Sequence, residues 1–187
     1  MKTPKYLEKF LYSQDSKYDS AEDLVTGNEN VLTAYEQALS EIKGGAKRSH
    51  WMWFVFPQIK GLGYSGVSRY YEIKNLKQAK AYLKNETLRS RLIEISEALL
   101  GLKSSNANKI MGYPDNLKLK SSMTLFAEAD PSCSTFQAVL DKFYNGKKDD
   151  KTLKLIDIWI NPPKDKKWWE IADEIHRESE EVKLNGR

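Results

Sequence analysis

The side chains best suited to bind a ligand are concentrated in residues 48–58, which read Arg-Ser-His-Trp-Met-Trp-Phe-Val-Phe-Pro-Gln. Each large ring in this stretch offers on the order of 150–250 Å² of apolar surface. A planar guanidinium such as that of Arg48 stacks on rings and binds an anion through two hydrogen bonds. The candidate contacts are Arg48, His50, Trp51, Trp53, Phe56 and Gln58. We therefore expect this segment to line a pocket, with a purely architectural role in the core as the alternative. The density of rings also predicts that Trp53 and Phe56 are mostly buried.

A second group of polar side chains opens a predicted helix at residues 115–124. Lys118 and Ser122 are four residues apart and share one helix face, and Ser121 lies beside them. These groups would line a polar cleft, although close packing of small side chains is the alternative. Asp115 is a candidate helix cap or a candidate catalytic acid. We expect this helix start and residues 48–58 to face one shared cleft.

Glycines and hydroxyls lie between these two groups. Gly61 and Gly63 would let the backbone approach a ligand closely, and a simple turn is the alternative. Tyr64, Ser65 and Tyr70 add hydroxyl groups. Glu72 is the next carboxylate and a second candidate catalytic acid, with a surface charge as the alternative. No pairing with a serine or cysteine, and no nearby acid in the sequence, marks His50 as a general base.

Composition excludes several classes of protein. A length of 187 residues predicts one domain, which buries about two-thirds of its surface. The net charge of +4 comes from lysines interspersed with acids, which favours a solvated surface over a polyanion patch. With Cys133 and two histidines, the chain lacks the ligands of a zinc site, and we expect no metal and no cofactor. Because the sequence has no long apolar run and a single cysteine, we expect a cytoplasmic protein with no membrane partner.

Apolar residues spaced by three and four predict a mainly α single domain of about seven helices. Only residues 51–56 look extended, within an irregular aromatic and glycine-rich insertion after the first long helix. Residues 1–27 are polar and weakly periodic, which predicts a loosely attached arm. Residues 28–158 would form the helical domain, and residues 159–187 an appended helix and tail. The predicted helices fall within residues 31–42, 75–83, 88–102, 115–129, 136–143, 149–156 and 168–175, with a short turn at 107–111.

The segment 47–58, followed by Gly-Leu-Gly-Tyr-Ser at 61–65, closely resembles the signature of the domain-of-unknown-function family numbered 1810, which is sometimes labelled calpastatin-like. Further blocks match in order at residues 79–92, 115–126 and 136–153. The resemblance covers residues 28–156 and implies a mainly helical single domain.

A weaker similarity connects the chain to the NADAR (NAD- and ADP-ribose-associated) superfamily. It rests on the segment Trp53–Pro57, on Tyr70 and Tyr71, and on the helices that begin near Lys118 and Phe136. That resemblance implies a nucleotide or ADP-ribose-like ligand and cleavage of N-glycosidic bonds. The superfamily has Glu-His-Tyr where this chain has Ser68-Arg69-Tyr70, so Glu72 or Asp115 would have to supply the carboxylate.

The leading hypothesis is therefore a domain that binds a nucleotide or ADP-ribose-like, phosphate-bearing small molecule in an aromatic cleft, either as a binding domain alone or as a hydrolase of an N-glycosidic bond. The expected roles are stacking by Trp51, Trp53 and Phe56, phosphate contacts by Arg48 and Lys118, and contacts with ribose or phosphate oxygens by Ser121 and Ser122. One alternative is a non-catalytic interaction or regulatory module. Another is a single-stranded nucleic-acid binder, which is disfavoured because the lysines do not cluster around the aromatic segment.

Overall fold

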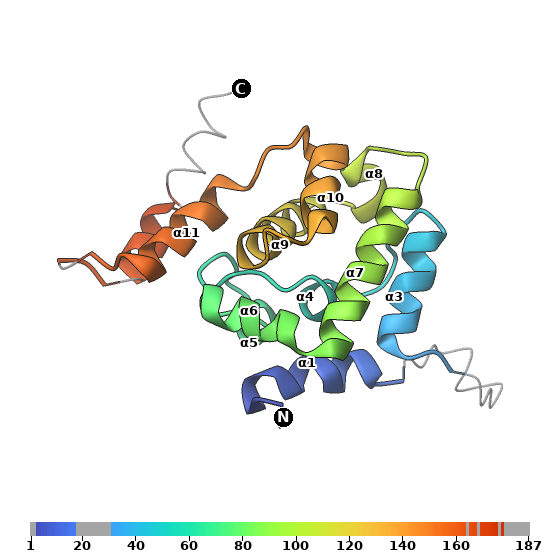
Figure 1. Cartoon of the computed structure of the whole chain (residues 1–187), viewed down its shortest axis with the longest axis horizontal. Helices are drawn as coiled ribbons and strands as arrows, with labels where there is room; N and C mark the ends of the chain where they lie inside the picture. Colours follow the sequence, from blue (N-terminus) through green and yellow to red (C-terminus); the bar gives the residue numbers. More distant parts are fainter. Residues whose placement is uncertain (1–2, 18–30, 164, 168, 176, 178–187) are drawn as a thin grey trace.

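Helix α9 (Asp115–Ala129) forms the centre of the computed structural model, and its middle is buried on every side. It packs against α6 (Leu76–Lys84), α8 (Ala107–Met111), α10 (Ser134–Tyr144) and α11 (Asp150–Ile160), as Figure 1 shows. Every residue from 121 to 127 is at most 7% exposed. A helix covered all round combines large apolar side chains with small ones, which explains the mixture of Leu, Met and Phe with Ser, Thr and Ala.

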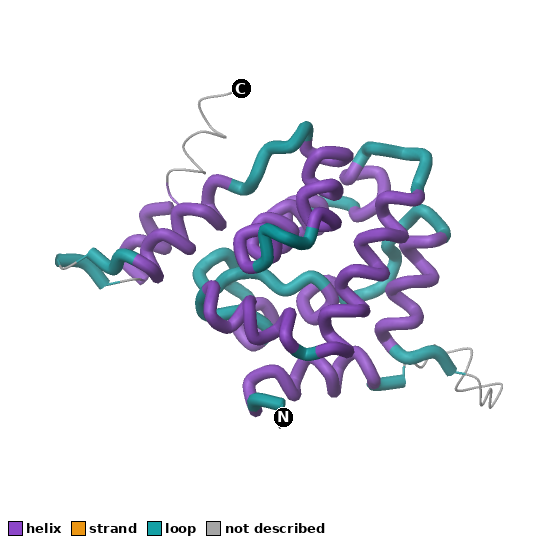
Figure 2. Tube along the Cα trace, viewed as in Figure 1, coloured by secondary structure: helices purple, strands orange, loops and turns teal. Residues whose placement is uncertain are grey.

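The structure describes residues 3–17, 31–163, 165–167, 169–175 and 177. Within these ranges the chain is mainly helical, with two isolated bridges and no strand (Figure 2). The predicted mainly α single domain is confirmed. The helices outnumber the seven expected because residues 5–15 and 107–111 are also helical, and because the aromatic and glycine-rich insertion contains two short helices, α4 (Met52–Val55) and α5 (Gly66–Tyr70).

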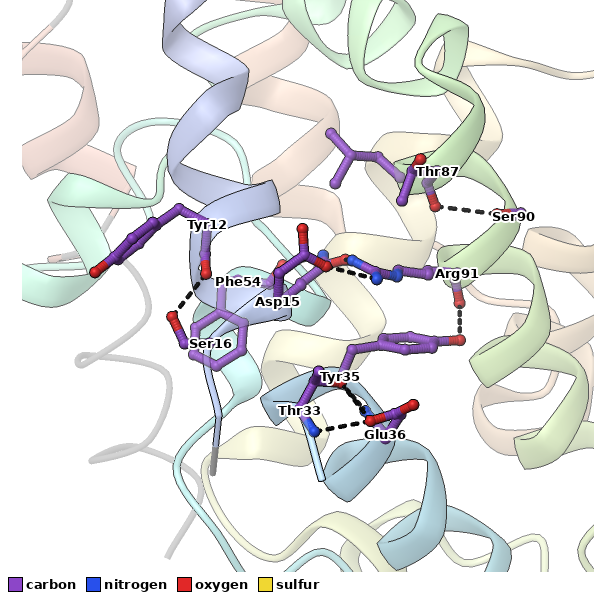
Figure 3. A network of polar contacts seen from close by, with 12 residues as sticks. Tyr12, Asp15, Ser16, Thr33, Tyr35, Glu36, Phe54, Thr87, Ser90 and Arg91 are labelled. Atoms are coloured by element: carbon purple, nitrogen blue, oxygen red, sulfur yellow. Dashed lines mark hydrogen bonds and ion pairs between the residues drawn. The ribbon is translucent and has the colours of Figure 1, made fainter. Parts of the chain in front are cut away.

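Four of the longer helices in the described part of the chain begin at side-chain caps that the sequence displays. Besides the helices given above, the structure contains α1 (Lys5–Asp15), α3 (Ala34–Lys43) and α7 (Glu86–Gly101). Thr33 and Glu36 cap the start of α3 reciprocally, as Figure 3 shows. Asn75, Asn85 and Asp149 cap α6, α7 and α11 by accepting hydrogen bonds from backbone amides three residues on. These local signals explain why the predicted periodic segments became helices.

Residues 52–55 form a helical turn, so the prediction that residues 51–56 are extended is wrong. Val55 and Phe56 donate backbone hydrogen bonds to Trp51 and Met52, which closes one helical turn. These four residues, at positions i, i+1, i+4 and i+5, are each at most 1% exposed. Trp53 is half-buried and lies outside the hydrophobic core. The apparent alternation of rings is therefore one helical face turned inward and one turned outward.

The N-terminal residues 5–15 form a packed helix, so the expectation of a loosely attached arm does not hold for them. Leu7 and Phe10 are 0% and 1% exposed and belong to the core. The buried Gln14 side chain donates to the Phe54 carbonyl oxygen at 2.9 Å. Figure 3 shows Asp15 at the end of α1 directed at Arg91 of α7, with a distance of 2.6 Å between Arg91 Nη2 and Asp15 Oδ1. Residues 18–27 of the expected arm lie outside the described residues.

We predict that Arg91→Ala loosens α1. The guanidinium carbon lies 5.0 Å from the centre of the Tyr35 ring, and its nitrogens bind Gln14 and Asp15. Losing these contacts should lower the free energy of unfolding by about 1–2 kcal/mol. Hydrogen exchange should become faster in α1 and stay unchanged in α10. Lys84→Ala, which removes an exposed charge on α6, is the control, and unchanged protection of α1 would contradict the prediction.

Residues 169–175 form a helical segment beyond the break at Asn161-Pro162-Pro163. Ala172 and Ile175 are each 6% exposed and join the hydrophobic core. This segment therefore packs against the rest of the described chain, while the domain boundaries that the sequence predicts stay a prediction. The expected tail at residues 178–187 lies outside the described residues.

Candidate functional site

A buried carboxylate, Glu41, holds the start of the aromatic segment. Its oxygens accept hydrogen bonds from the backbone amides of Arg48 and Ser49 at 2.7 and 3.1 Å and from Trp51 Nε1 at 2.8 Å. The Ser49 hydroxyl and the Gln37 side chain complete the set. Burial alone would raise the pKa of Glu41, but these hydrogen bonds outweigh it and lower the pKa to about 2. Glu41 is therefore ionised and fixes the Arg-Ser-His-Trp stretch.

The sequence contains a signal for Glu41 that motif reading missed. The apolar face of α3 includes Ala34, Ala38 and Ile42, and Glu41 occupies a position on that same face. A charged residue in an apolar stripe must find partners inside the protein. The position of Glu41 in this apolar stripe, rather than the rings of the aromatic segment alone, indicates where that segment attaches to the helices.

Two lysines and one aspartate join the aromatic segment to the start of α9. Asp115 Oδ2 lies 2.7 Å from Lys47 Nζ, and its Oδ1 lies 2.7 Å from Lys118 Nζ. Lys47 Nζ also lies 5.1 Å from the centre of the Trp51 ring, and Lys118 Nζ lies 4.8 Å from that of Trp53. The two segments are thus joined by an ion pair that Lys47 makes rather than Arg48, and the shared cleft between them stays a prediction.

Asp115 acts in this cluster as an ionised partner. Burial by itself would raise its pKa, but hydrogen bonds from Lys118 and Lys47 keep the pKa below its ordinary value. Asp115 is the first residue of α9. The N-cap position is occupied by Pro114, and no side-chain hydrogen bond caps the helix. A carboxylate held between two ammonium groups is poorly suited to donate a proton.

The other predicted contacts are divided between the core, the interior of α9 and the surface. Trp51 and Phe56 are 1% and 0% exposed, so their rings are occupied by core packing. The Gln58 side chain donates to the buried hydroxyl of Ser121, which links the aromatic segment to α9. Ser122 is 0% exposed, and its hydroxyl has no hydrogen-bond partner among the described residues. Arg48 and His50 are exposed.

The glycine-rich stretch is a closed loop, residues 60–72, that includes α5. Ile59 and Ile73 form a parallel bridge at its base, with hydrogen bonds of 2.8 Å from Lys60 N to Ile73 O and from Ile73 N to Gln58 O. A Cβ at Gly63 would lie 2.4 Å from Ser68, so only glycine fits there. Gly61 has φ +100°, which favours glycine, and a Cβ there would lie 3.2 Å from Leu155 Cδ2. The close backbone approaches that Gly61 and Gly63 allow are therefore made to Leu155 and Ser68 of the same chain.

Ser65 and Tyr70 stand at the two ends of α5. The Ser65 hydroxyl accepts a hydrogen bond from the Ser68 backbone amide at 3.1 Å and so caps the helix. Tyr70 is 58% exposed, its ring packs edge-on against Tyr71, and Lys9 Nζ lies 5.2 Å from its centre. Ser65 therefore has a structural use, whereas the Tyr70 ring remains accessible.

A hollow of about 400 Å³ opens beside this loop. Its volume falls within the roughly 300–1,000 Å³ typical of small-molecule sites. Six lining residues come from the loop and three from the C-terminal helical segment. They are Lys60, Gly61, Gly63, Tyr64, Arg69, Glu72, Trp169, Ala172 and Asp173. The hollow therefore combines two cationic, two carboxylate and two aromatic side chains, of which the sequence analysis singled out Tyr64 and Glu72.

A second, small hollow connects these residues with the aromatic segment. It has room for about 10 Å³, roughly one water molecule, and is lined by Trp53, Gln58, Ile59, Gly63, Ser68, Tyr71 and Glu72. Glu72 and Gly63 line both hollows. Trp53 thus has Lys118 over its ring and shares a hollow with Glu72.

Three lysines surround Glu72. Lys60 Nζ lies 3.7 Å from Glu72 Oε1, and Lys9 and Lys74 are close enough to act through their charges. Burial raises the pKa of Glu72 above its ordinary value, and the charges of the lysines oppose that shift without cancelling it. A carboxyl group with a raised pKa in a hollow is typical of functional sites, although ion-pair networks also produce such shifts.

Among the residues that the structure describes, no group of three or more His, Cys, Asp and Glu side chains could hold a metal ion. The expected absence of a metal and of a cofactor stays a prediction. No helix in the described part of the chain combines the length and apolar composition that crossing a membrane requires.

Comparison of the chain with known proteins places it in a defined protein family. Residues 4–156 match the family described as "Protein of unknown function (DUF1810)", and the chain belongs to that family. It is also similar to a crystal structure of the conserved hypothetical protein Rv1873 from Mycobacterium tuberculosis, with 38% sequence identity and a TM-score of 0.69. That match covers 81% of this chain and 96% of the other. No curated protein matches the chain. The family match begins at residue 4, which agrees with the packing of α1.

Proposed function

We propose that this protein binds a nucleotide or an ADP-ribose-like molecule in the hollow beside loop 60–72. One observation carries the proposal: Lys60 and Arg69 line the same hollow as the rings of Tyr64 and Trp169. Cationic side chains suit a phosphate, and flat aromatic side chains suit a base. Tyr64 and Trp169 are 57% and 47% exposed, so their surfaces are accessible to a ligand.

The predicted aromatic cleft contributes to this site through Trp53. Trp53 and Gln58 line the small hollow that adjoins the large one at Gly63 and Glu72. Lys118 lies over the Trp53 ring and would extend the site toward the start of α9. Contacts of the ligand with Arg48, His50, Tyr70, Ser121 and Ser122 stay predictions. Trp51 and Phe56 are left out because their rings are buried in the core.

The reaction that suits this site is hydrolysis of an N-glycosidic bond, with Glu72 as the assisting carboxylate. Water would add to the anomeric carbon, the carbon–nitrogen bond would break, and the proton of the water would pass to the leaving nitrogen. The transition state resembles an oxocarbenium ion, which a nearby carboxylate stabilises. Glu72 is preferred to Asp115 because it lines both hollows, whereas two lysines occupy the carboxylate of Asp115.

The alternatives predict different behaviour. A non-catalytic interaction module would bind no nucleotide and would leave the hollow without a soluble ligand. A single-stranded nucleic-acid binder would prefer oligonucleotides and lose affinity steeply with salt. The small-molecule proposal is favoured because the cationic and aromatic side chains line one bounded hollow. The single cysteine, Cys133, supports a cytoplasmic location.

A thermal-shift screen tests the proposal with ADP-ribose, NAD, ribose 5-phosphate and a short oligonucleotide. A ligand at about 100 times its dissociation constant should stabilise the fold by about 2.7 kcal/mol. Arg69→Ala should weaken binding about 10- to 100-fold because a charge-assisted hydrogen bond is lost, whereas Lys84→Ala should bind normally. Failure of the wild-type protein to bind any of the nucleotides would overturn the proposal. Release of free base from ADP-ribosyl substrates, abolished in Glu72→Gln with binding retained, would establish the hydrolytic role.

A further inference from the structure

One wall of the large hollow comes from residues beyond the family domain. The family match ends at residue 156, whereas Trp169, Ala172 and Asp173 line the hollow. The opposite wall is loop 60–72, which lies inside the match. The hollow therefore exists in this form only because the C-terminal segment packs against the loop.

The C-terminal segment is held at the loop by close contacts. The Cβ position of Gly61 is 3.4 Å from Ala172 Cβ and 3.2 Å from Leu155 Cδ2, so a side chain at Gly61 would push the segment away. Ala172 and Ile175 are each 6% exposed, which anchors the segment in the core. Because this packing fixes the backbone that follows Trp169, it sets the place of the Trp169 ring at the wall.

The start of the segment is also tied together by local polar contacts. The Lys167 backbone amide donates to Glu170 Oε2 at 2.8 Å, and Lys166 Nζ lies 2.9 Å from Glu174 Oε1. Lys167 Nζ lies 5.1 Å from the centre of the Trp169 ring. Trp169 nevertheless keeps 47% of its surface exposed. A large ring with this exposure at the wall of a hollow is suited to stack on a planar group.

We propose that Trp169 stacks on the base of the bound nucleotide, and that the C-terminal segment thereby sets the ligand preference of this family member. This inference rests on the function proposed above and adds the part of the ligand that the segment contacts. Lys60 and Arg69 on the loop bind the phosphate, and Trp169 on the segment binds the base. Tyr64 lines the same hollow from the loop and offers the base a second ring.

The test compares Trp169 variants by calorimetry with two probes, ADP-ribose and ribose 5-phosphate, of which only the first contains a base. Trp169→Ala should weaken ADP-ribose binding about 5- to 100-fold and leave ribose 5-phosphate binding unchanged. Trp169→Phe keeps a ring and should restore most of the affinity. Ile160→Ala removes another exposed apolar side chain, one that does not line the hollow, and should bind like the wild type.

The possible outcomes separate the inference from the function on which it rests. Equal ADP-ribose affinity in wild type and Trp169→Ala overturns the stacking role and leaves the proposed function intact. Equal losses for both probes in Trp169→Ala and Trp169→Phe, with lowered melting temperatures, mean that the ring only supports the wall, which also overturns the inference. If the wild-type protein binds neither probe, the proposed function fails and the inference fails with it.

Discussion

Glu41→Ala is expected to lower the free energy of unfolding by about 3–5 kcal/mol, because it removes the acceptor of several buried donors. Trp51 Nε1 and the backbone amides of Arg48 and Ser49 would lose their partner while staying enclosed. Glu41→Gln keeps one oxygen acceptor and should cost less. Chemical denaturation measures both variants, with Glu97→Ala, an exposed residue of α7, as the control. A near-neutral Glu41→Ala would show that water replaces the carboxylate.

The same carboxylate predicts how stability depends on pH. Its pKa is about 2 in the folded protein, below the ordinary value of 4.5. A carboxylate with a lowered pKa contributes its full stability above the unfolded value, and this is lost as the pH falls toward the folded value. The loss between about pH 4.5 and pH 2 amounts to about 3 kcal/mol. In Glu41→Gln this part of the acid denaturation profile should be flatter than in the wild type.

Local signals accounted for most of the helices. Asn75, Asn85 and Asp149 are cap residues followed by apolar residues at helical spacing, and each begins a helix in the structure. Helix α1 shows the same spacing in Leu7 and Phe10, but the polar residues after it diluted the pattern when residues 1–27 were considered together. Such signals need only neighbours in sequence, which is why they can be read from one chain.

The candidate site could not be read in the same way because it depends on contacts between distant segments. Nothing near Trp169 in the sequence indicates that it lies across a hollow from Lys60 and Arg69. Lys47 and Lys118 likewise meet only because Asp115 lies between them in space. That the aromatic segment and the start of α9 face one shared cleft, which the complementary character of their side chains predicts, stays a prediction.

The faces of the aromatic segment were the hardest feature to predict. A helix as short as α4 contains four residues, too few for a period of 3.6 to be distinguished from alternation. Trp53 and Phe56 were both expected in the core, but only Phe56 lies there, at 0% exposure. Substitutions of these two rings are therefore expected to have opposite effects on stability and on ligand binding.

Phe56→Ala is expected to destabilise the protein by about 3–5 kcal/mol, because it leaves a cavity among core side chains that include Trp51, whose ring centre lies 6.2 Å away. Trp53→Ala should cost only about 1–2 kcal/mol, mainly through the lost contact with Lys118. Its larger effect should be on ligand affinity, since Trp53 lines the small hollow together with Glu72. Denaturation and ADP-ribose titration on both variants separate the roles. A severe loss of stability in Trp53→Ala, or a normal melting temperature in Phe56→Ala, would reverse the assignment of the inward and outward faces of α4.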